Sequence, residues 1–178
     1  MAAGTPRAEI GALVLDCDGV LTGGELFYGP EGHRLLCFNA KDGLGLALLC
    51  RAGVKVGVLS GRPVDIATAR LRELGVEPLI GRCRDKGAAV RQMCADWGVA
   101  PAACAFVGDD LPDLPAFAAV GLCIAVADAV PEVAAAAHWR TQAAGGRGAV
   151  REICEGLLKA RGPWPPAATS LKGERHAS

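Results

Sequence analysis

Residues 14–22 read VLDCDGVLT, an apolar run that ends in two aspartates, Asp16 and Asp18. A short apolar run of this kind, bounded by polar residues, is typical of a strand buried in a parallel sheet. Two carboxylates at a buried strand end repel one another, and burial makes that repulsion more costly. A fold retains such a pair where a bound cation or a shared proton offsets the cost. The stretch therefore predicts both a core strand and a chemical site.

The rest of the chain alternates between short apolar strands and helices. Strands are expected at residues 10–16, 54–59, 77–80, 104–107 and 122–126. Helices are expected at residues 41–52, 63–74, 85–97, 111–119, 130–137 and 149–160. This alternation predicts an α/β fold in which helices cover both faces of a parallel sheet. Residues 25–38 read instead as two short strands around the turn GPEG, which indicates a β-hairpin.

Length and composition fit one globular domain. The 178 residues are 51% hydrophobic and 21% charged, and Lys+Arg and Asp+Glu are both 19. We expect a single domain over residues 1–160, with the hairpin at about 24–38, and a Pro-rich tail at residues 161–178. A net charge of zero offers no basic excess for nucleic acid, and no apolar run reaches the ~18 residues of a membrane span. The N-terminus is a poor secretory signal, so we expect a cytoplasmic protein with no nucleic-acid or membrane partner.

The 8 cysteines form no CxxC pair, and most of them lie inside apolar runs. We interpret them as small buried hydrophobes in a reducing compartment rather than as a disulfide framework. With only 3 histidines in the chain, the pattern does not point to a zinc site.

Polar residues follow the predicted strands where an open α/β sheet binds its ligands, outside the carboxyl ends of the strands. Ser60, Gly61 and Arg62 follow the second strand. Lys86 opens a helix, and Asp109 follows a later strand. Side chains at i and i+2 of an extended segment point the same way, so the two aspartates of the first strand can face one cavity with this third acid. Three converging acids suit a hard cation, and Mg²⁺ fits a site of few carboxylates plus a substrate phosphate.

These residue types suggest a mechanism of phosphoryl transfer. Asp16 would attack phosphorus in line and form an aspartyl-phosphate. Asp18 would give a proton to the leaving alcohol and then take one from the attacking water, while its backbone carbonyl stays available to a metal. Lys86, the Ser60 hydroxyl and backbone amides would clamp the phosphate.

Four stretches resemble the motifs of the haloacid-dehalogenase (HAD) superfamily of phosphohydrolases, in the same order. They are DCDGVLT (16–22), LSGR (59–62), RDK (84–86) and VGDDLPD (107–113). The likeness covers about residues 10–160. It extends to one family, the 3-deoxy-D-manno-octulosonate 8-phosphate (KDO 8-phosphate) phosphatases, through stretches such as SGRPVDIATARLRELGV and AAGGRGAVREIC.

This resemblance implies a Rossmann-like HAD fold with the hairpin as a small flap and no cap domain. It implies a homotetramer in which neighbouring subunits complete the active site, and a sugar acid phosphate as the substrate. The site residues that it implies are Asp16, Asp18 and Asp109 for Mg²⁺, Ser60, Gly61 and Lys86 for the phosphate, and Arg62 and Arg70 near the sugar acid or a subunit interface. Asp110 and Asp113 would support the metal loop.

Several of these residues also suit purely structural roles. The acids after the fourth strand can cap the following helix, and Ser60 can cap the helix that begins near Pro63. Lys86 on its own would suit a solvated helix position. Arg147, in the stretch GGRGAV, is a candidate substrate or interface contact, although the stretch can also be a plain turn before a helix.

Three functions stay open at this point: hydrolysis of KDO 8-phosphate, hydrolysis of a nine-carbon sugar acid 9-phosphate (2-keto-3-deoxynononate or N-acylneuraminate), and a non-catalytic oligomerisation module. Nine-carbon enzymes of the family tend to carry Glu after the SG or TG of the second motif, where this chain has Arg62, and this favours the eight-carbon substrate. The related scaffold modules have degraded acids, whereas all of them are intact here. A scaffold does not need costly buried acids, so the enzyme is favoured.

Overall fold

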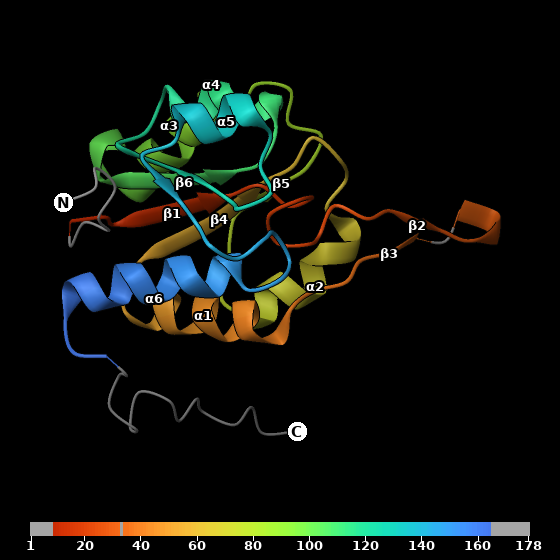
Figure 1. Cartoon of the computed structure of the whole chain (residues 1–178), viewed down its shortest axis with the longest axis horizontal. Helices are drawn as coiled ribbons and strands as arrows, with labels where there is room; N and C mark the ends of the chain where they lie inside the picture. The colour runs from red at the N-terminus through yellow and green to blue at the C-terminus, as the bar shows by residue number, and fades with distance from the viewer. Residues whose placement is uncertain (1–8, 33, 165–178) are drawn as a thin grey trace.

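A six-stranded parallel sheet forms the centre of the structure, a computed structural model that describes residues 9–32 and 34–164 (Figure 1). The strands, in their order across the sheet, are β5 (Leu79–Ile80), β4 (Lys55–Leu59), β1 (Ala12–Leu15), β6 (Cys104–Gly108), β7 (Leu122–Ala125) and β8 (Trp139–Arg140). The chain passes from β1 outward to β5, and then crosses to β6 on the other side. The strand order therefore reverses between β1 and β6, which is where open α/β folds bind their ligands.

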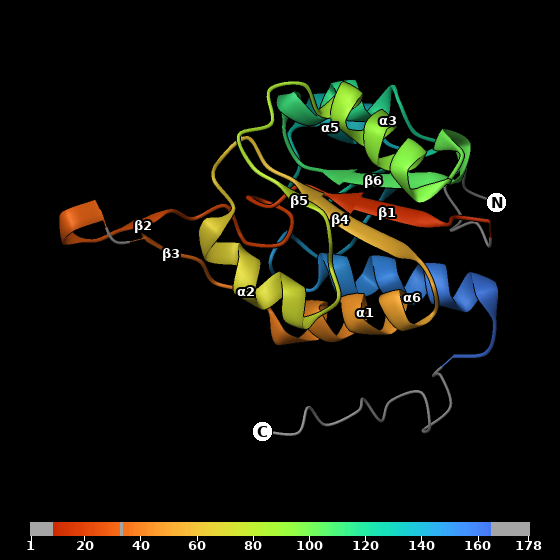
Figure 2. The same ribbon diagram turned by 180° about the vertical axis from the view of Figure 1, so that it is seen from behind.

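Helices cover both faces of this sheet (Figures 1 and 2). The helices α3, α4 and α5 lie over one face, and α1, α2 and α6 lie over the other. Their bounds are α1 (Ala40–Arg51), α2 (Asp65–Glu73), α3 (Lys86–Trp97), α4 (Leu114–Phe117), α5 (Pro131–Ala136) and α6 (Ala149–Arg161). The predicted α/β fold, with its sheet covered on both faces, is confirmed.

The core lies between the sheet and these two helical layers. Every residue of β1, β6 and β7 is buried, which explains why their sequences are continuously apolar. The rings of Phe106 in β6 and Phe117 in α4 meet edge to face, with centroids 6.2 Å apart. At the start of α1, the Asn39 side chain accepts the Lys41 N–H and so caps the helix.

Two elements differ from the expected pattern. The helix expected at 111–119 is split into a 3₁₀ turn (Leu111–Asp113) and α4. Pro115 has no N–H to bond the carbonyl of Leu111, so a continuous α-helix cannot form across this point. Strand β8 was not expected, because a strand of only two residues shows no alternation of apolar and polar side chains in the sequence. It forms by pairing with β7.

The predicted hairpin is present and projects away from the body of the molecule (Figure 1). Its strands β2 (Phe27–Tyr28) and β3 (Arg34–Leu35) pair antiparallel and are joined through a 3₁₀ turn at Pro30–Gly32. The side chains of Phe27, Tyr28 and Leu35 are 53%, 65% and 71% exposed. A pair of two-residue strands with apolar side chains facing outward cannot bury a core of its own.

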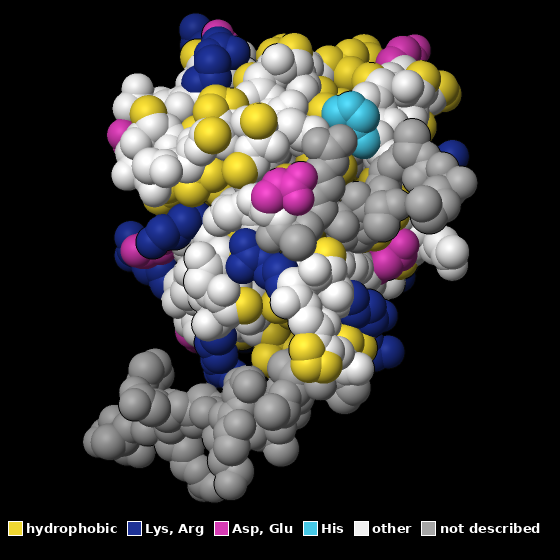
Figure 3. All heavy atoms as spheres, turned by 90° about the vertical axis from the view of Figure 1, so that its left-hand side faces the viewer, with side chains coloured by type: hydrophobic (Ala, Val, Ile, Leu, Met, Phe, Trp, Pro, Cys, Tyr) yellow, Lys and Arg dark blue, Asp and Glu magenta, His cyan; other side chains and the backbone are white. Residues whose placement is uncertain are grey.

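Past α6, the described chain ends with Trp164. The Arg151 guanidinium and the Lys159 ammonium lie 5.6 Å and 5.7 Å from its ring centre. Most of the predicted tail at 161–178 lies outside the described residues. Within the described ranges no helix has the length and apolar character to cross a membrane. On the face seen in Figure 3, basic and acidic side chains are interspersed.

Candidate active site

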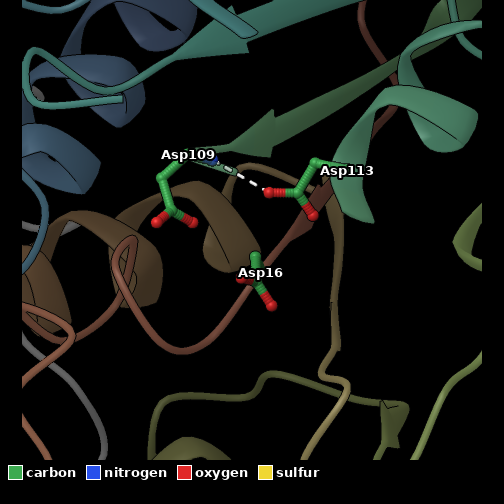
Figure 4. A group of neighbouring side chains, drawn as sticks. All are labelled: Asp16, Asp109 and Asp113. Atoms are coloured by element: carbon green, nitrogen blue, oxygen red, sulfur yellow. Dashed lines mark hydrogen bonds between the residues drawn. The ribbon is translucent and has the colours of Figure 1, made fainter. Parts of the chain in front are cut away.

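Three carboxylates converge at the switch point of the sheet (Figure 4). Asp16 follows β1, Asp109 follows β6, and Asp113 belongs to the 3₁₀ turn beyond β6. One oxygen from each of the three lies within 4.8 Å of the other two. Asp16 and Asp113 are buried, and Asp109 is half-buried. Like charges at such distances destabilise the fold unless positive charge is added.

Lys86 supplies part of that positive charge. It is the first residue of α3, and its side chain is 4% exposed. Its Nζ atom lies 2.8 Å from Asp16 Oδ1 and 2.6 Å from Asp113 Oδ1. Burial lowers the pKa of Lys86, but the two carboxylates outweigh burial and raise it, so the lysine stays charged. The alternative of a solvated helix lysine is therefore wrong.

Both carboxylate oxygens of Asp113 are occupied by contacts within the fold. Besides Lys86, its carboxylate accepts the backbone N–H groups of Asp109 (2.9 Å) and Asp110 (3.3 Å). These bonds fix the loop after β6 and aim the Asp109 side chain toward Asp16 (Figure 4). Asp113 therefore supports the loop as expected, and the binding of a metal by this loop stays a prediction.

One lysine does not neutralise three acids. The Asp109 Oδ1 atom is buried and has no hydrogen-bond partner among the described residues. Burial and the charges of Asp16 and Asp113 raise the pKa of Asp109 to about 8. Burial and Asp113 raise the pKa of Asp16 to about 6, although Lys86 opposes the shift. An unpaired buried carboxylate oxygen beside a second acid is the environment that a divalent cation satisfies.

Asp18 points away from this group. Its Oδ2 lies 3.5 Å from Arg62 Nε, and the guanidinium of Arg62 also donates to the Tyr28 hydroxyl at 2.8 Å. The Arg62 guanidinium carbon is 5.9 Å from the centre of the Tyr28 ring. Asp18 therefore lies between the acid cluster and the hairpin, with its carboxyl free of the cluster.

The acid cluster, Lys86, Asp18 and Arg62 all line one open cavity of about 240 Å³. The residues that line it are Asp16, Asp18, Gly61, Arg62, Lys86, Asp109, Asp110, Pro112 and Asp113. Ser60 is buried beneath the β4 end of the cavity, where its hydroxyl accepts the N–H of Arg62 at 3.0 Å. Ser60 thus makes a local turn contact and does not cap α2, which begins at Asp65 without a side-chain cap.

Comparison with known proteins identifies the family. A family model of haloacid dehalogenase-like hydrolases matches residues 39–121. The KDO 8-phosphate phosphatase KdsC of Yersinia pestis is 39% identical over 154 residues, which are 86% of this chain and 82% of that protein. The KdsC of Escherichia coli K12 is 40% identical over 157 residues, 88% of this chain and 84% of that protein. The chain belongs to the KdsC-like family of HAD hydrolases.

A solved structure of this family adds ligands to the comparison. The KDO 8-phosphate phosphatase of Moraxella catarrhalis, crystallised with a magnesium ion, a phosphate ion and a KDO molecule, has a TM-score of 0.84 to this chain and is 36% identical. The aligned region covers 86% of this chain and 88% of the Moraxella catarrhalis chain. The cobalt-bound enzyme of Haemophilus influenzae has a TM-score of 0.87 at 38% identity, covering 93% of this chain and 98% of its own.

The KdsC-like site brings together most of the residues expected from sequence. Asp16, Lys86 and Asp109 meet in one cluster. Asp18, Gly61 and Arg62 line the same cavity. Arg70 does not join them: it lies on α2, pairs with Glu73 at 3.2 Å, and packs near Gly43 of α1. Its contact with substrate or an interface stays a prediction.

One contact from the hairpin to the site was not expected. Tyr28 reaches Arg62 from the hairpin, and no local motif marks this single tyrosine as a site residue. Cys17 lies between the two aspartates but is 3% exposed, and burial and the flanking acids raise the pKa of its thiol to about 12. The thiol is therefore protonated at neutral pH, in agreement with the interpretation of the cysteines as small buried hydrophobes.

Proposed function

We propose that this chain is an Mg²⁺-dependent phosphomonoesterase that hydrolyses KDO 8-phosphate to KDO and phosphate. The observation that carries the proposal is the cluster of Asp16, Asp109 and Asp113 around Lys86, with a buried, unpartnered oxygen on Asp109. This charge pattern suits a cation and a phosphate together. The family membership supports the sugar acid as the alcohol component of the ester.

The acids of the cluster are suited to hold Mg²⁺. Asp16 and Asp109 would provide carboxylate ligands, and the backbone carbonyl of Asp18 a third, while Asp113 orients the loop. The unpartnered Asp109 oxygen fits this assignment, since oxygen ligands are what a hard cation requires. When bound, the cation would neutralise charge on the phosphoryl group and on the attacking carboxylate.

The chain's own residues then account for the chemistry. The Asp16 carboxylate attacks phosphorus, the bond from phosphorus to the sugar oxygen breaks, and an aspartyl-phosphate forms. Asp18 donates a proton to the departing sugar oxygen. It then accepts a proton from the water that attacks phosphorus, and Asp16 is released with inorganic phosphate. The Asp18 carboxyl is free for this work because it lies outside the acid cluster and close to Arg62.

The remaining cavity residues would bind the substrate. Lys86 and Gly61 line the cavity and would hold the phosphate at the ends of α3 and β4, together with the Ser60 hydroxyl beneath the β4 end. Donors placed there would stabilise the negative charge on the phosphoryl group in the transition state. Arg62 lies at the outer edge, between Asp18 and Tyr28, and would meet the sugar acid. An arginine at this position suits the carboxylate of KDO, because its guanidinium can bind a carboxylate with two parallel hydrogen bonds.

We further propose a homotetramer in the cytoplasm, acting in lipopolysaccharide precursor synthesis. The hairpin supports the assembly: it projects from the molecule with Phe27 and Leu35 exposed, and it leaves the cavity open within one chain. Exposed apolar side chains of this kind mark a contact surface. A neighbouring subunit that covers them would also close the site.

The test is phosphate release with KDO 8-phosphate beside the two nine-carbon 9-phosphates, with and without EDTA. We expect Mg²⁺-dependent release from KDO 8-phosphate with the highest kcat/KM of the three. Preference for a nine-carbon substrate would overturn the choice of sugar and keep the mechanism. Release from none of the three would overturn the enzymatic proposal and favour the assembly module.

A further inference from the structure

The buried carboxylate of Asp42 lies outside the cavity and has no part in the proposed chemistry. It belongs to the first turn of α1 and is 2% exposed. It does not cap its own helix, because Asn39 does so. Its two oxygens instead accept the backbone N–H groups of Arg151 (2.7 Å) and Gly148 (3.2 Å) at the start of α6. Asp42 therefore caps a helix that begins more than one hundred residues later, at roughly the energy of an N-cap side chain.

The loop before α6 depends on this cap. Helix α6 starts after Gly148, whose φ of 111° favours glycine, and no side chain of its own caps it. Two further carboxylates hold the same loop: Asp128 accepts the Gly145 N–H at 2.9 Å, and Glu152 accepts the N–H groups of Gln142 and Ala143. Three carboxylates from three segments thus fix the backbone of residues 142–151.

This loop packs against Gly19 and Val20, which directly follow the two aspartates proposed to be catalytic. The Gly146 N–H donates to the Val20 carbonyl at 2.9 Å. A Cβ atom on Gly145 would lie 1.7 Å from the Gly19 carbonyl oxygen, so the two backbones touch with no room for a side chain. Gly19 (φ 92°) faces the site with its other side, since a Cβ there would lie 2.0 Å from Asp109 Oδ2. Gly19 is therefore enclosed between the loop and the acid cluster.

We propose that Asp42 is a positioning residue of the active site. Its carboxylate fixes the Gly145–Gly148 loop. The loop in turn holds Gly19 against Asp109 and so fixes the position of the Asp18 side chain relative to that of Asp16. The loop also presents Arg147 to Glu25 at the foot of the hairpin, at 3.1 Å. The proposal rests on the phosphatase function above, because it concerns the geometry of that site.

The test compares Asp42→Asn with Cys154→Ala. The Asp42→Asn substitution would keep the shape of the side chain but set an amide NH₂ against one of the two N–H donors. Cys154 is fully buried in α6 and lies against Gly45 of α1, so its truncation loosens the same helix pair without removing a loop contact. We expect both variants to unfold at a lower temperature, but only Asp42→Asn to lose kcat, by between about 10- and 100-fold with KM little changed.

Hydrogen exchange gives a second readout that needs no activity. Asp42→Asn should speed exchange of the amides at 19–23 and 145–148, and Cys154→Ala should leave these two segments as in the wild type. Equal kcat losses in the two variants, or wild-type kcat in Asp42→Asn, would overturn the proposal. If Asp42→Asn does not fold, Asp128→Ala removes the acceptor of the Gly145 N–H, another anchor of the same loop, and should give the same pattern more weakly.

The two proposals fail separately. A wild-type chain that releases no phosphate from any sugar acid phosphate would overturn the function. An active wild type with unchanged exchange and kcat in Asp42→Asn would overturn the positioning role alone.

Discussion

The carboxyl edge of the sheet and the hairpin are built in opposite ways. At the sheet edge, Asp16 and Asp113 are buried, share Lys86, and have their loops fixed by backbone hydrogen bonds. In the hairpin, two strands of two residues carry Phe27 and Leu35 into solvent. The buried edge holds all of the side chains that are proposed to react, whereas the exposed hairpin is the surface that a neighbouring subunit would cover in the proposed assembly.

The largest expected effect comes from removing the proposed nucleophile, Asp16, at the buried edge. Asp16→Asn should lower kcat by at least about 10⁴-fold, because the neutral amide cannot attack phosphorus. Steady-state phosphate release measures this loss. Asp96→Asn, an exposed acid of α3 outside the cavity, is the matched control and should keep wild-type activity. Substantial turnover in Asp16→Asn would show that the edge is not the reacting centre.

The next effect concerns Lys86, the positively charged side chain at the same edge. Lys86→Met should lower kcat by about 10²–10³-fold, since a donor to the transferring phosphoryl group is lost. It should also lower the free energy of unfolding by about 3–5 kcal/mol, because Asp16 and Asp113 lose their buried partner. Urea unfolding and steady-state kinetics measure the two effects. A variant with normal kcat and normal stability would contradict the description of the edge as a charge-balanced cluster.

A smaller effect is expected at the hairpin. The double variant Phe27→Ser with Leu35→Ser should weaken self-association and lower kcat/KM by about tenfold, while the fold of each chain is kept. Light scattering and kinetics with KDO 8-phosphate measure these changes. Leu44→Ser, at an exposed apolar side chain of α1, is the control. If the hairpin variant keeps both assembly and kcat/KM, the proposed division between edge and hairpin is wrong.

A last effect is a dependence of stability on pH in the metal-free protein. The folded chain keeps the Asp109 proton up to a pKa of about 8, whereas the unfolded chain loses it near 3.8. Stability from this group is therefore complete below about pH 4 and is lost as pH rises through 8. The melting temperature in EDTA should fall between about pH 5.5 and about pH 8.5, and Mg²⁺ should restore most of it at the higher pH.

Asp109→Asn separates this group from other titrations. Its amide carries no charge, so the variant should melt at a higher temperature than the wild type in EDTA at about pH 8.5, and Mg²⁺ should give it little gain. A wild type whose melting temperature is flat with pH, or a variant that gains as much from Mg²⁺ as the wild type, would contradict the assignment.

The sequence predicts the parts of the molecule that depend on local pattern. The apolar runs mark β1, β4 and β6, and the rule that ligands bind beyond strand ends is enough to bring Asp16, Lys86 and Asp109 together. The helix predicted at 111–119 is too long, because apolar periodicity alone does not register that Pro115 interrupts the hydrogen-bond ladder.

Side-chain directions and long-range contacts could not be predicted. Nothing in the spacing DxD says that the Asp18 carboxyl turns toward Arg62 while Asp113 completes the acid cluster. The contact of Asp42 with Arg151 joins segments far apart in the chain, through backbone groups that carry no sequence signal. Strand β8 likewise exists only because β7 offers it a pairing edge.

The most direct test of the central claim is to trap the covalent intermediate. The enzyme is mixed with KDO 8-phosphate and Mg²⁺, quenched during turnover with borohydride, digested and sequenced by mass spectrometry. Borohydride reduces an aspartyl-phosphate to homoserine, and we predict homoserine at position 16 with Asp18 unmodified. Homoserine at another aspartate, or none while phosphate is being released, would contradict the account of Asp16 as the nucleophile.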